Sequence, residues 1–341
     1  MTTSLLTVSV QDAWQTTVNA LREVGVPDAH AGLQADLLVD AEARGLPSHG
    51  LLRLPRVIER IRNGVTDPVT TGDLQWRGSA LASVDGRNGL GPVVGWHALQ
   101  AISQRCRSGS GIAAAAVHAT NHLGMLAWYA RRVAADGLTC VVLTTSEALM
   151  HPYGGRKAMV GSNPIAIGVP ADPRPLVFDM ATSSVSMGKI HDHALRGAPL
   201  QPGWALDEHG EPTTDAQSAI RGAIAPFGGP KGYGLGLAFE VLVTALTGAA
   251  LGTSVAGTLD SIHPANKGDV FIVAEAHHSR EISHYLDEVR SSPPAEPAAP
   301  VRIPGDQSDI RRAAAETGGL HLPVDLWRQI TSLAHEQKGS R

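Results

Sequence analysis

Hydrophobic residues near the start of the chain recur at the spacing of an α-helix. This pattern predicts helices over residues 11–24, 28–44 and 51–62. Gly25 follows the first helix and is typical of a helix C-terminus, while Ser48 is the expected N-cap of the third. The beginning of the chain is therefore predicted to be helical.

Between residues 70 and 180 the pattern changes to short apolar runs that are separated by glycine, proline, asparagine and aspartate. Such runs are typical of strands, and two longer stretches with helical spacing lie between them. The predicted strands cover residues 112–117, 139–144, 165–169 and 176–179, and the predicted helices cover residues 91–107 and 125–135. Because strands and helices alternate, this part of the chain is predicted to have an α/β fold.

The last third of the chain combines one apolar helix with a polar tail. Residues 235–246 are mainly apolar and predict a long helix that is largely buried. Residues 270–274 predict one more strand. Residues 291–300 contain four prolines and predict a linker or an exposed loop. The tail then returns to a helical pattern, which predicts helices over residues 307–316 and 323–336.

The length and composition fit one large domain or two smaller ones. The chain has 341 residues, of which 43% are hydrophobic and 18% charged, so it can bury a sizeable core and is not disordered as a whole. We predict a helical part that is built from both ends of the chain, residues 1–70 and 305–341. It adjoins a central α/β domain of residues 71–304.

Charge and composition argue against several classes of protein. The net charge of −4 and the pI near 6.4 disfavour a nucleic-acid-binding protein, which needs a basic surface. The chain shows neither a secretory signal nor a run of about 18 apolar residues, so no membrane span is expected. With two cysteines and no zinc-type spacing among the histidines, no metal centre is expected. A cytoplasmic enzyme remains the expectation.

Common nucleotide-binding and hydrolase motifs are absent or out of context. Residues 109–114 match the pattern G-x-G-x-x-A, but no strand precedes them and a strand, not a helix, is predicted to follow. A Rossmann phosphate site needs the reverse order, strand first and helix second. The sequence also contains no P-loop and no G-x-S-x-G motif. It therefore does not indicate a Rossmann dinucleotide site, a P-loop NTPase or a serine hydrolase.

Two short segments carry residues that suit chemistry on a carboxylic acid. Residues 48–53 (SHGLLR) place His49 and Arg53 one helical turn apart, and an arginine can bind a carboxylate through two parallel hydrogen bonds. Residues 120–124 (TNHLG) place His122 in a polar turn directly after a predicted strand. Because imidazole titrates near neutral pH, His122 can exchange a proton with a substrate. The alternatives are an ordinary surface arginine and a histidine that only stabilises a turn.

Lysine is rare in this chain and is concentrated near glycine. Only five of the 28 basic residues are lysines, and four of them lie in the glycine-containing segments 151–157, 188–189, 226–234 and 266–268: Lys157, Lys189, Lys231 and Lys267. Glycine lets the backbone approach a ligand closely, and lysine supplies a point charge for a phosphate. Several such loops indicate a large anionic ligand such as a dinucleotide, bound without a Rossmann fold, although each loop alone is also typical of a tight turn.

These segments, in this order, resemble the malate/L-lactate dehydrogenase family of the sulfolactate dehydrogenase type. This family differs from the Rossmann-fold lactate dehydrogenases, and it includes ureidoglycolate dehydrogenase, diketogulonate reductase and Δ1-piperideine-2-carboxylate reductases. The resemblance extends from Glu42 to Gly234 at near-family spacing. Besides the two histidine segments, its landmarks are residues 152–155 (PYGG), 161–164 (GSNP), 179–182 (DMAT), 188–189 (GK), 203–207 (GWALD), 212–215 (PTTD) and 228–234 (GGPKGYG), with a later one at 303–306 (IPGD).

The resemblance implies a sulfolactate-dehydrogenase-like α/β fold with a non-Rossmann NAD(P)-binding domain. It also implies a homodimer and NAD(P)-dependent hydride transfer at a carbon that bears a carboxylate. His122 matches the family's catalytic acid/base, and His49 and Arg53 match residues of the catalytic substrate pocket. The positions that match cofactor contacts are Ser146, Asp179, Met180, Ala181, Lys231, Asn266, Lys267 and Gly268.

One residue of the pocket departs from the family pattern. Val57 stands where many members have a tyrosine, two helical turns after His49, and it makes the pocket more apolar. We predict an NADP- or NAD-dependent oxidoreductase for a small 2-oxo or 2-hydroxy carboxylic acid of the malate or lactate type. Val57 keeps open a second function, the reduction of cyclic imino acids such as Δ1-piperideine- or Δ1-pyrroline-2-carboxylate. A third, more distant alternative is an NAD(P)-binding protein without catalytic activity.

Overall fold

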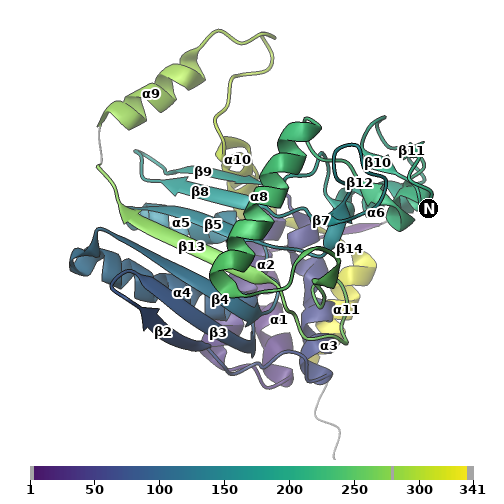
Figure 1. Ribbon diagram of the computed structural model, residues 1–341. Coiled ribbons are helices and arrows are strands. Elements are labelled where there is room, and N and C mark those ends of the chain that lie inside the picture. The colour runs from purple at the N-terminus through teal and green to yellow at the C-terminus, as the bar shows by residue number, and fades with distance from the viewer. Residues whose placement is uncertain (1–3, 278–279, 336–341) are drawn as a thin grey trace, which may run out of the picture.

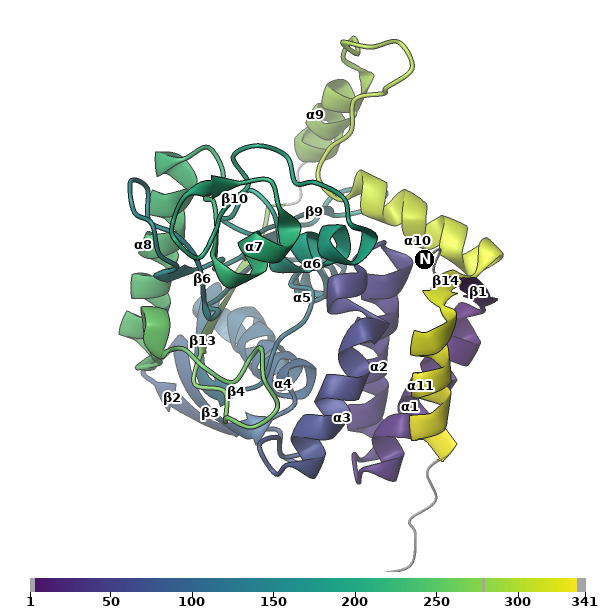
Figure 2. The ribbon, with the colours of Figure 1, turned by 90° about the vertical axis from the view of Figure 1, so that its right-hand side faces the viewer.

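The computed structural model describes residues 4–277 and 280–335 of the chain. Helices from both ends form one layer of the molecule (Figure 2). In this layer α11 packs against α1 and α3, and α10 packs against α2. The layer consists of α1 (Val10–Glu23), α2 (Asp28–Ala43), α3 (Leu54–Arg62), α10 (Asp306–Gly318) and α11 (Val324–His335). All five predicted terminal helices are present, although the last predicted residue, Glu336, lies outside the described part.

A short antiparallel pair joins the two ends of the chain. Strand β1 (Leu5–Val8) pairs with β14 (Leu320–Pro323), which the sequence pattern did not predict. The hydrophobic core is continuous from α1, α2 and α3 into the central sheet. Packing alone thus does not separate the two predicted parts from each other. The division into residues 1–70 plus 305–341 and residues 71–304 stays a prediction.

The third predicted helix begins later than expected. Residues 47–53 form two short 3₁₀ turns, Pro47–His49 and Leu51–Arg53, and α3 starts only at Leu54. Pro55 has no N–H group to donate to the carbonyl of residue 51, so an α-helix cannot extend back without losing that bond. The prediction that Ser48 caps this helix is wrong. Its hydroxyl instead lies 3.0 Å from Nδ1 of His49.

The central sheet has seven strands in the order β2-β3-β4-β13-β5-β8-β9 (Figure 1). Only β3 and β4 are parallel, and α4 (Gly91–Arg105) connects them, while all other neighbours are antiparallel. This order is not that of a doubly wound Rossmann sheet. The strands are β2 (Asp73–Arg77), β3 (Leu81–Gly89), β4 (Ile112–Thr120), β5 (Leu138–Thr144), β8 (Ile165–Val169), β9 (Leu176–Met180) and β13 (Gly268–Glu275), and α5 (Ala127–Ala135) precedes β5.

The α/β prediction for this region is confirmed. Each strand and helix that the pattern predicts between residues 91 and 180 has a counterpart, whereas β2 and β3 were not predicted. The G-x-G-x-x-A segment runs through a short turn, Cys106–Ser110, directly into β4. No helix follows this segment, so it lacks the geometry of a Rossmann phosphate site.

A second, smaller sheet lies beside the central one and has its own apolar core. Its strands are only two or three residues long, too short to leave a hydrophobic period in the sequence. The strand order is β11 (Pro212–Thr213), β10 (Ala205–Leu206), β12 (Ala223–Ile224), β6 (Ala148–Met150) and β7 (Val160–Gly161), with α6 (Met187–Arg196) and α7 (Ala216–Arg221) packed beside it.

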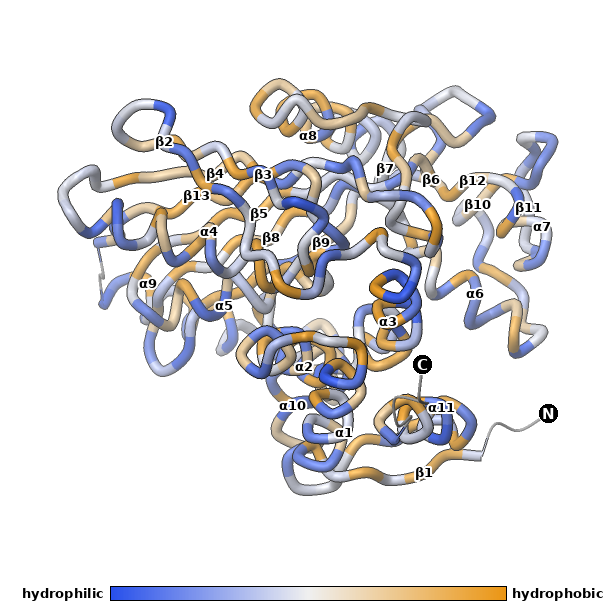
Figure 3. The backbone as a smooth tube through the Cα atoms, turned by 90° about the horizontal axis from the view of Figure 1, so that it is seen from below, coloured by the Kyte–Doolittle hydropathy of each residue, from blue (hydrophilic) through white to orange (hydrophobic). Residues whose placement is uncertain are grey.

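Helix α8 (Pro230–Thr247) is less buried than its sequence predicts. Gly236, Glu240 and Val243 are among the residues on its buried side. Leu237, Val241 and Leu242 are 39%, 53% and 46% exposed, so apolar side chains of the helix remain uncovered. Helix α8 lies at the edge of the molecule and contains many apolar residues (Figure 3). The prediction of a largely buried helix is therefore wrong for a single copy of the chain.

The remaining elements are connecting segments. Helix α9 (Arg280–Ser291) projects from the body of the molecule (Figure 1), and the proline-rich residues after it form the irregular connection predicted there. A 3₁₀ turn, Gly252–Ser254, lies in the long connection between α8 and β13. Within the described residues, no helix combines the length and the apolar character needed to cross a membrane.

Candidate active site

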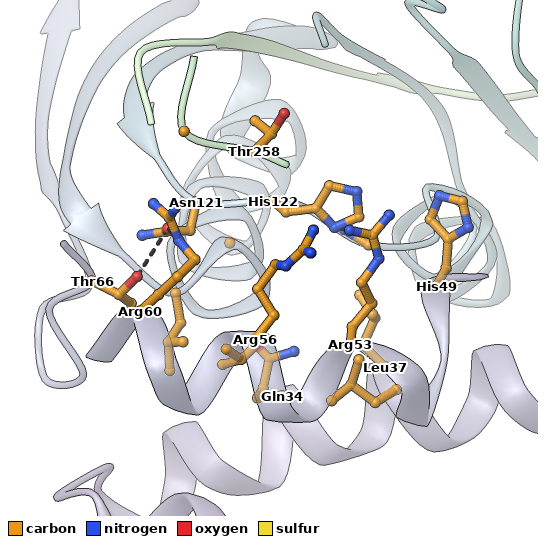
Figure 4. A pocket seen from close by; sticks show the side chains of 16 residues that line it. Gln34, Leu37, His49, Arg53, Arg56, Arg60, Thr66, Asn121, His122 and Thr258 are labelled. Carbon is orange, nitrogen blue, oxygen red and sulfur yellow. Dashed lines mark hydrogen bonds between the residues drawn. The ribbon is translucent and has the colours of Figure 1, made fainter. Parts of the chain in front are cut away.

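One pocket brings together residues that are far apart in the sequence (Figure 4). Helix α2 and the segment from the 3₁₀ turns into α3 form one side, and the turn after β4 with the connection near residue 258 forms the other. The pocket contains His49, Arg53, Val57 and His122, four residues that the sequence assigned to one site. Its other lining residues are Gln34, Leu37, Leu38, Arg56, Arg60, Thr66, Leu90, Gly91, Asn121, Gly124, Gly257 and Thr258.

His122 lies two residues beyond the end of β4, as the sequence predicts. The backbone N–H of Gly124 donates a hydrogen bond of 3.1 Å to its Nδ1 atom. This bond orients the ring and leaves Nε2 as the nitrogen that can contact a ligand in the pocket. The ring also stacks against that of His49, with 5.6 Å between the ring centroids.

Both histidines of the pocket are neutral at pH 7. Burial and, next, the positive charge of Arg53 hold the pKa of His122 well below its ordinary value. The same two causes lower the pKa of His49 to about 4. Burial removes water that would stabilise the imidazolium form, and a nearby cation disfavours a second positive charge.

Arg53 presents an unpaired guanidinium group to the pocket. Its Nε donates a hydrogen bond of 2.7 Å to the carbonyl of Ser48, which fixes the plane of the group. Within residues 4–277 and 280–335, no carboxylate forms an ion pair with it. Burial and the charge of Arg56 lower the pKa of Arg53 to about 10, so it stays charged at neutral pH. Such a group can bind a carboxylate through two hydrogen bonds.

Asn121 connects the His122 turn to α3. Its Oδ1 accepts hydrogen bonds of 2.9 Å from Nε of Arg60 and from the hydroxyl of Thr66, and its Nδ2 donates to the carbonyls of residues 88 and 89. Arg60 also donates to the carbonyls of Asp260 and His263. This network holds the turn, α3 and the connection near residue 258 in one arrangement, since every hydrogen bond in it is made by buried or half-buried groups.

A second group of predicted residues lies around the start of α8. The Ser146 hydroxyl accepts a hydrogen bond from the backbone of Ser162, whose carbonyl accepts one from the backbone of Thr182, directly after β9. The carbonyl of Thr182 in turn accepts from the backbone of Phe227, just before α8. The structure thus brings Ser146, the end of β9 and the exposed Lys231 into one neighbourhood.

Asp179 connects this neighbourhood to the His122 turn. Its carboxylate accepts a hydrogen bond of 2.8 Å from the backbone N–H of Ala127, at the start of α5. The residue keeps accessible surface, but protein atoms surround the carboxyl group, and this desolvation raises the pKa of Asp179 to about 6. Met180 and Ala181, next in sequence, are half-buried.

Asn266, Lys267 and Gly268 make structural contacts. The Asn266 side chain bonds to the backbone of residues 254 and 256. Lys267 is fully buried, and its ammonium group donates to both carboxylate oxygens of Asp269, at 2.5 and 2.6 Å. A side chain on Gly268 would collide with Thr247 and with the residues around it. The Lys267 ammonium is thus not accessible as a free charge, and the predicted contacts of these three residues with a cofactor stay a prediction.

Several pocket residues were not found from the sequence. Arg56 and Arg60 follow Arg53 by three and seven residues, so helical spacing on α3 could have indicated them. Gln34 and Thr258 carry no such signal, because only the packing of distant segments brings them to the pocket.

Comparison with known proteins identifies the family. The sequence model of the malate/L-lactate dehydrogenase family matches residues 8–331. The chain belongs to this family. A dehydrogenase structure from Sinorhizobium meliloti is 49% identical, with a TM-score of 0.94, and the alignment covers 97% of this chain and 99% of that one. The resemblance predicted from the sequence and its sulfolactate-dehydrogenase-like α/β fold are both confirmed.

Two characterised relatives carry more specific names. The L-sulfolactate dehydrogenase of Methanocaldococcus jannaschii is 34% identical over 94% of both chains, and its structure has a TM-score of 0.90. The (2R)-3-sulfolactate dehydrogenase (NADP(+)) of Chromohalobacter salexigens is 33% identical over 96% of this chain and 98% of its own length. The prediction that this chain is a dehydrogenase is confirmed by its family.

Proposed function

We propose that the protein catalyses NAD(P)-dependent hydride transfer at C2 of a small 2-oxo or 2-hydroxy carboxylic acid. One observation carries this proposal: the unpaired guanidinium group of Arg53 and the oriented ring of His122 share a pocket. The names of the relatives, which are sulfolactate dehydrogenases, give independent support for a carboxylate substrate. A non-catalytic NAD(P)-binding protein would have no use for this pair.

Each residue of the pocket has a defined part in the proposed reaction. Arg53 binds the substrate carboxylate and so fixes the adjacent C2 atom in the pocket. In reduction the imidazolium form of His122, which is favoured once the substrate carboxylate neutralises Arg53, donates its Nε2 proton to the C2 oxygen. The neutral ring then keeps its remaining proton on Nδ1 in place of the hydrogen bond from Gly124, and oxidation runs this transfer in reverse. His49, stacked on His122, limits the motion of that ring and excludes water from one side of it.

The residues near the start of α8 suit a dinucleotide. Lys231 is exposed in the first turn of an 18-residue helix, where the helix dipole also favours an anion. Gly228 and Gly229 precede the helix with φ of +54° and +61°, and a Cβ atom built at Gly228 would meet, within 4 Å in the described chain, only the Cβ of Lys231 at 3.9 Å. Lys231 would hold a phosphate group, with Ser146, Asp179, Met180 and Ala181 nearby. NADH or NADPH, when bound, supplies the hydride.

Val57 favours a second candidate function, the reduction of cyclic imino acids. It lines the pocket one helical turn after Arg53, where its methyl groups offer an apolar surface to a ring. In that reaction His122 would exchange its proton with a ring nitrogen instead of an oxygen. Arg53 would bind the carboxylate in the same way.

A panel of substrates distinguishes these functions. We expect oxidation of NADH or NADPH, followed at 340 nm, with at least one of pyruvate, oxaloacetate and 2-oxoglutarate. Δ1-Piperideine-2-carboxylate and Δ1-pyrroline-2-carboxylate are the comparison substrates. Turnover with the cyclic imines alone would replace the proposed function by the second candidate. Binding of NADPH without turnover of any 2-oxo or 2-imino acid would contradict both.

We also propose that a second copy of the chain covers the exposed face of α8. Three exposed leucine and valine side chains on one helix leave an apolar surface in contact with water, which is unfavourable. We expect sedimentation equilibrium to give twice the mass of the chain, and Leu242→Asp to shift the protein toward the monomer. A wild-type monomer at micromolar concentration would contradict this proposal. The cytoplasmic location expected from the sequence stays a prediction.

A further inference from the structure

The pocket contains a second arginine that the proposed reaction does not use. Arg56 lies three residues after Arg53 on α3, and its side chain points to the same side of the helix, toward His122 (Figure 4). The residue is exposed, and its guanidinium group has no hydrogen bond or ion pair with any residue of the described chain. A flexible arginine that lines a pocket without a partner is available to a ligand.

The charges around Arg56 are not balanced by the protein. Three arginines line the pocket, but no aspartate or glutamate is among its lining residues. Arg60 is engaged with Asn121 and with backbone carbonyls, so Arg53 and Arg56 remain. Acidic side chains near the pocket have other partners: Glu59 accepts from Ser261, Glu147 accepts from residues 258 and 259, and Asp260 accepts from the backbone of residues 262 and 263.

Arg53, Arg56 and His122 also act on one another electrostatically. The charge of Arg56 lowers the pKa of Arg53 and contributes to the lowered pKa of His122. Two like charges held close together in a partly dry pocket are unfavourable until an anion neutralises them. A substrate with one carboxylate neutralises Arg53 alone and leaves Arg56 uncompensated.

We propose that Arg56 binds a second anionic group of the substrate, so that the enzyme prefers dianionic 2-oxo and 2-hydroxy acids over monoanionic acids of the same length. This inference rests on the proposed function, in which Arg53 binds the carboxylate next to C2. The second group is a carboxylate or a sulfonate, because a guanidinium group binds either through paired hydrogen bonds. This contact of Arg56 would select among substrates, whereas Arg53 and His122 bind and protonate the reacting part of each of them.

Two substrates of equal chain length test the preference. Oxaloacetate and 2-oxobutanoate both have four carbons and a 2-oxo acid group, but only oxaloacetate carries a second carboxylate. We expect the wild-type enzyme to favour oxaloacetate, or its sulfonate counterpart 3-sulfopyruvate, in kcat/KM. Arg56→Gln should lower kcat/KM for the preferred dianion by about 10–100-fold while changing that for 2-oxobutanoate by less than about threefold.

A matched variant separates this effect from a general loss of positive charge. Arg62→Gln removes the same charge from the same helix at a position outside the pocket, and it should leave the preference unchanged. An equal loss for both substrates in Arg56→Gln would overturn the inference. So would an effect confined to the KM for NADPH, since Arg56 would then bind the cofactor.

The binding of acids that cannot be reduced tests the role of Arg56 independently of the proposed function. Succinate and butyrate have four carbons with two and one carboxylates, and neither can be reduced at C2. We expect calorimetry to show that succinate binds more tightly than butyrate to the wild type but not to Arg56→Gln. Selective binding of succinate together with no turnover of any 2-oxo acid would overturn the proposed function alone. Equal binding of both acids to the wild type would overturn the inference alone.

Discussion

Replacing His122 by alanine is expected to lower kcat by about 10²–10⁴-fold, the usual contribution of a general acid or base. The side chain is oriented by the backbone of Gly124 and stacks on His49, and the proposed reaction assigns the proton transfer to it alone. The KM for the acid should change little, because Arg53 still binds the carboxylate. Steady-state kinetics with the substrate identified in the panel measures both constants.

A control variant and the wild-type pH profile check this assignment independently. His118 lies on β4, outside the pocket, and His118→Ala should retain activity. In oxidation His122 accepts a proton and therefore acts in its neutral form. Because the pKa of His122 lies well below 6.5 in the free enzyme, that form is lost only as the pH falls through the lowered pKa. We expect kcat/KM for oxidation to be constant from about pH 7 to about pH 9. If kcat/KM for oxidation already fell as the pH was lowered from 8, His122 would not be neutral at pH 7 and the assignment would be contradicted.

The larger elements of the fold could be predicted from the sequence because their own residues determine them. Helices α1 and α2 and strand β8 have enough length for a clear hydrophobic period, and their bounds agree with the prediction within a residue or two. The two-residue strands of the small sheet exist only because of their pairing partners. A pattern along a single segment cannot reveal them.

The site was predictable where neighbouring residues carry it. His49 and Arg53 lie in one short segment and His122 follows a recognisable strand, so these three stood out from the residues themselves, whereas Val57 was identified only through the family resemblance. Gln34 and Thr258 reach the pocket only through tertiary packing. The exposure of α8 was also beyond the sequence, because an apolar helix has the same pattern whether its own chain or a second copy covers it.

Replacing Arg53 by alanine is expected to lower kcat/KM for the acid by about 10²–10³-fold, mainly through a higher KM. Removing one partner from a buried pair of charges costs about 2–5 kcal/mol, because the carboxylate of the substrate then enters the pocket without a counter-charge. The effect should exceed that of Arg56→Gln, since Arg53 binds the carboxylate next to the reacting carbon in every substrate of the panel. Initial-rate kinetics at saturating NADPH gives the comparison.

The lysine variant shows whether geometry or charge alone is responsible. Nε of Arg53 is committed to the carbonyl of Ser48, so the terminal nitrogens are left to bind the carboxylate in one fixed plane. A lysine keeps the positive charge, but its hydrogen-bond donors all lie on one nitrogen, and it has no planar group with a second donor nitrogen to hold that plane. Arg53→Lys should therefore recover only a small part of the activity that Arg53→Ala loses. Wild-type kinetics in Arg53→Lys would mean that a point charge is sufficient, and the two-bond contact with the carboxylate would have to be abandoned.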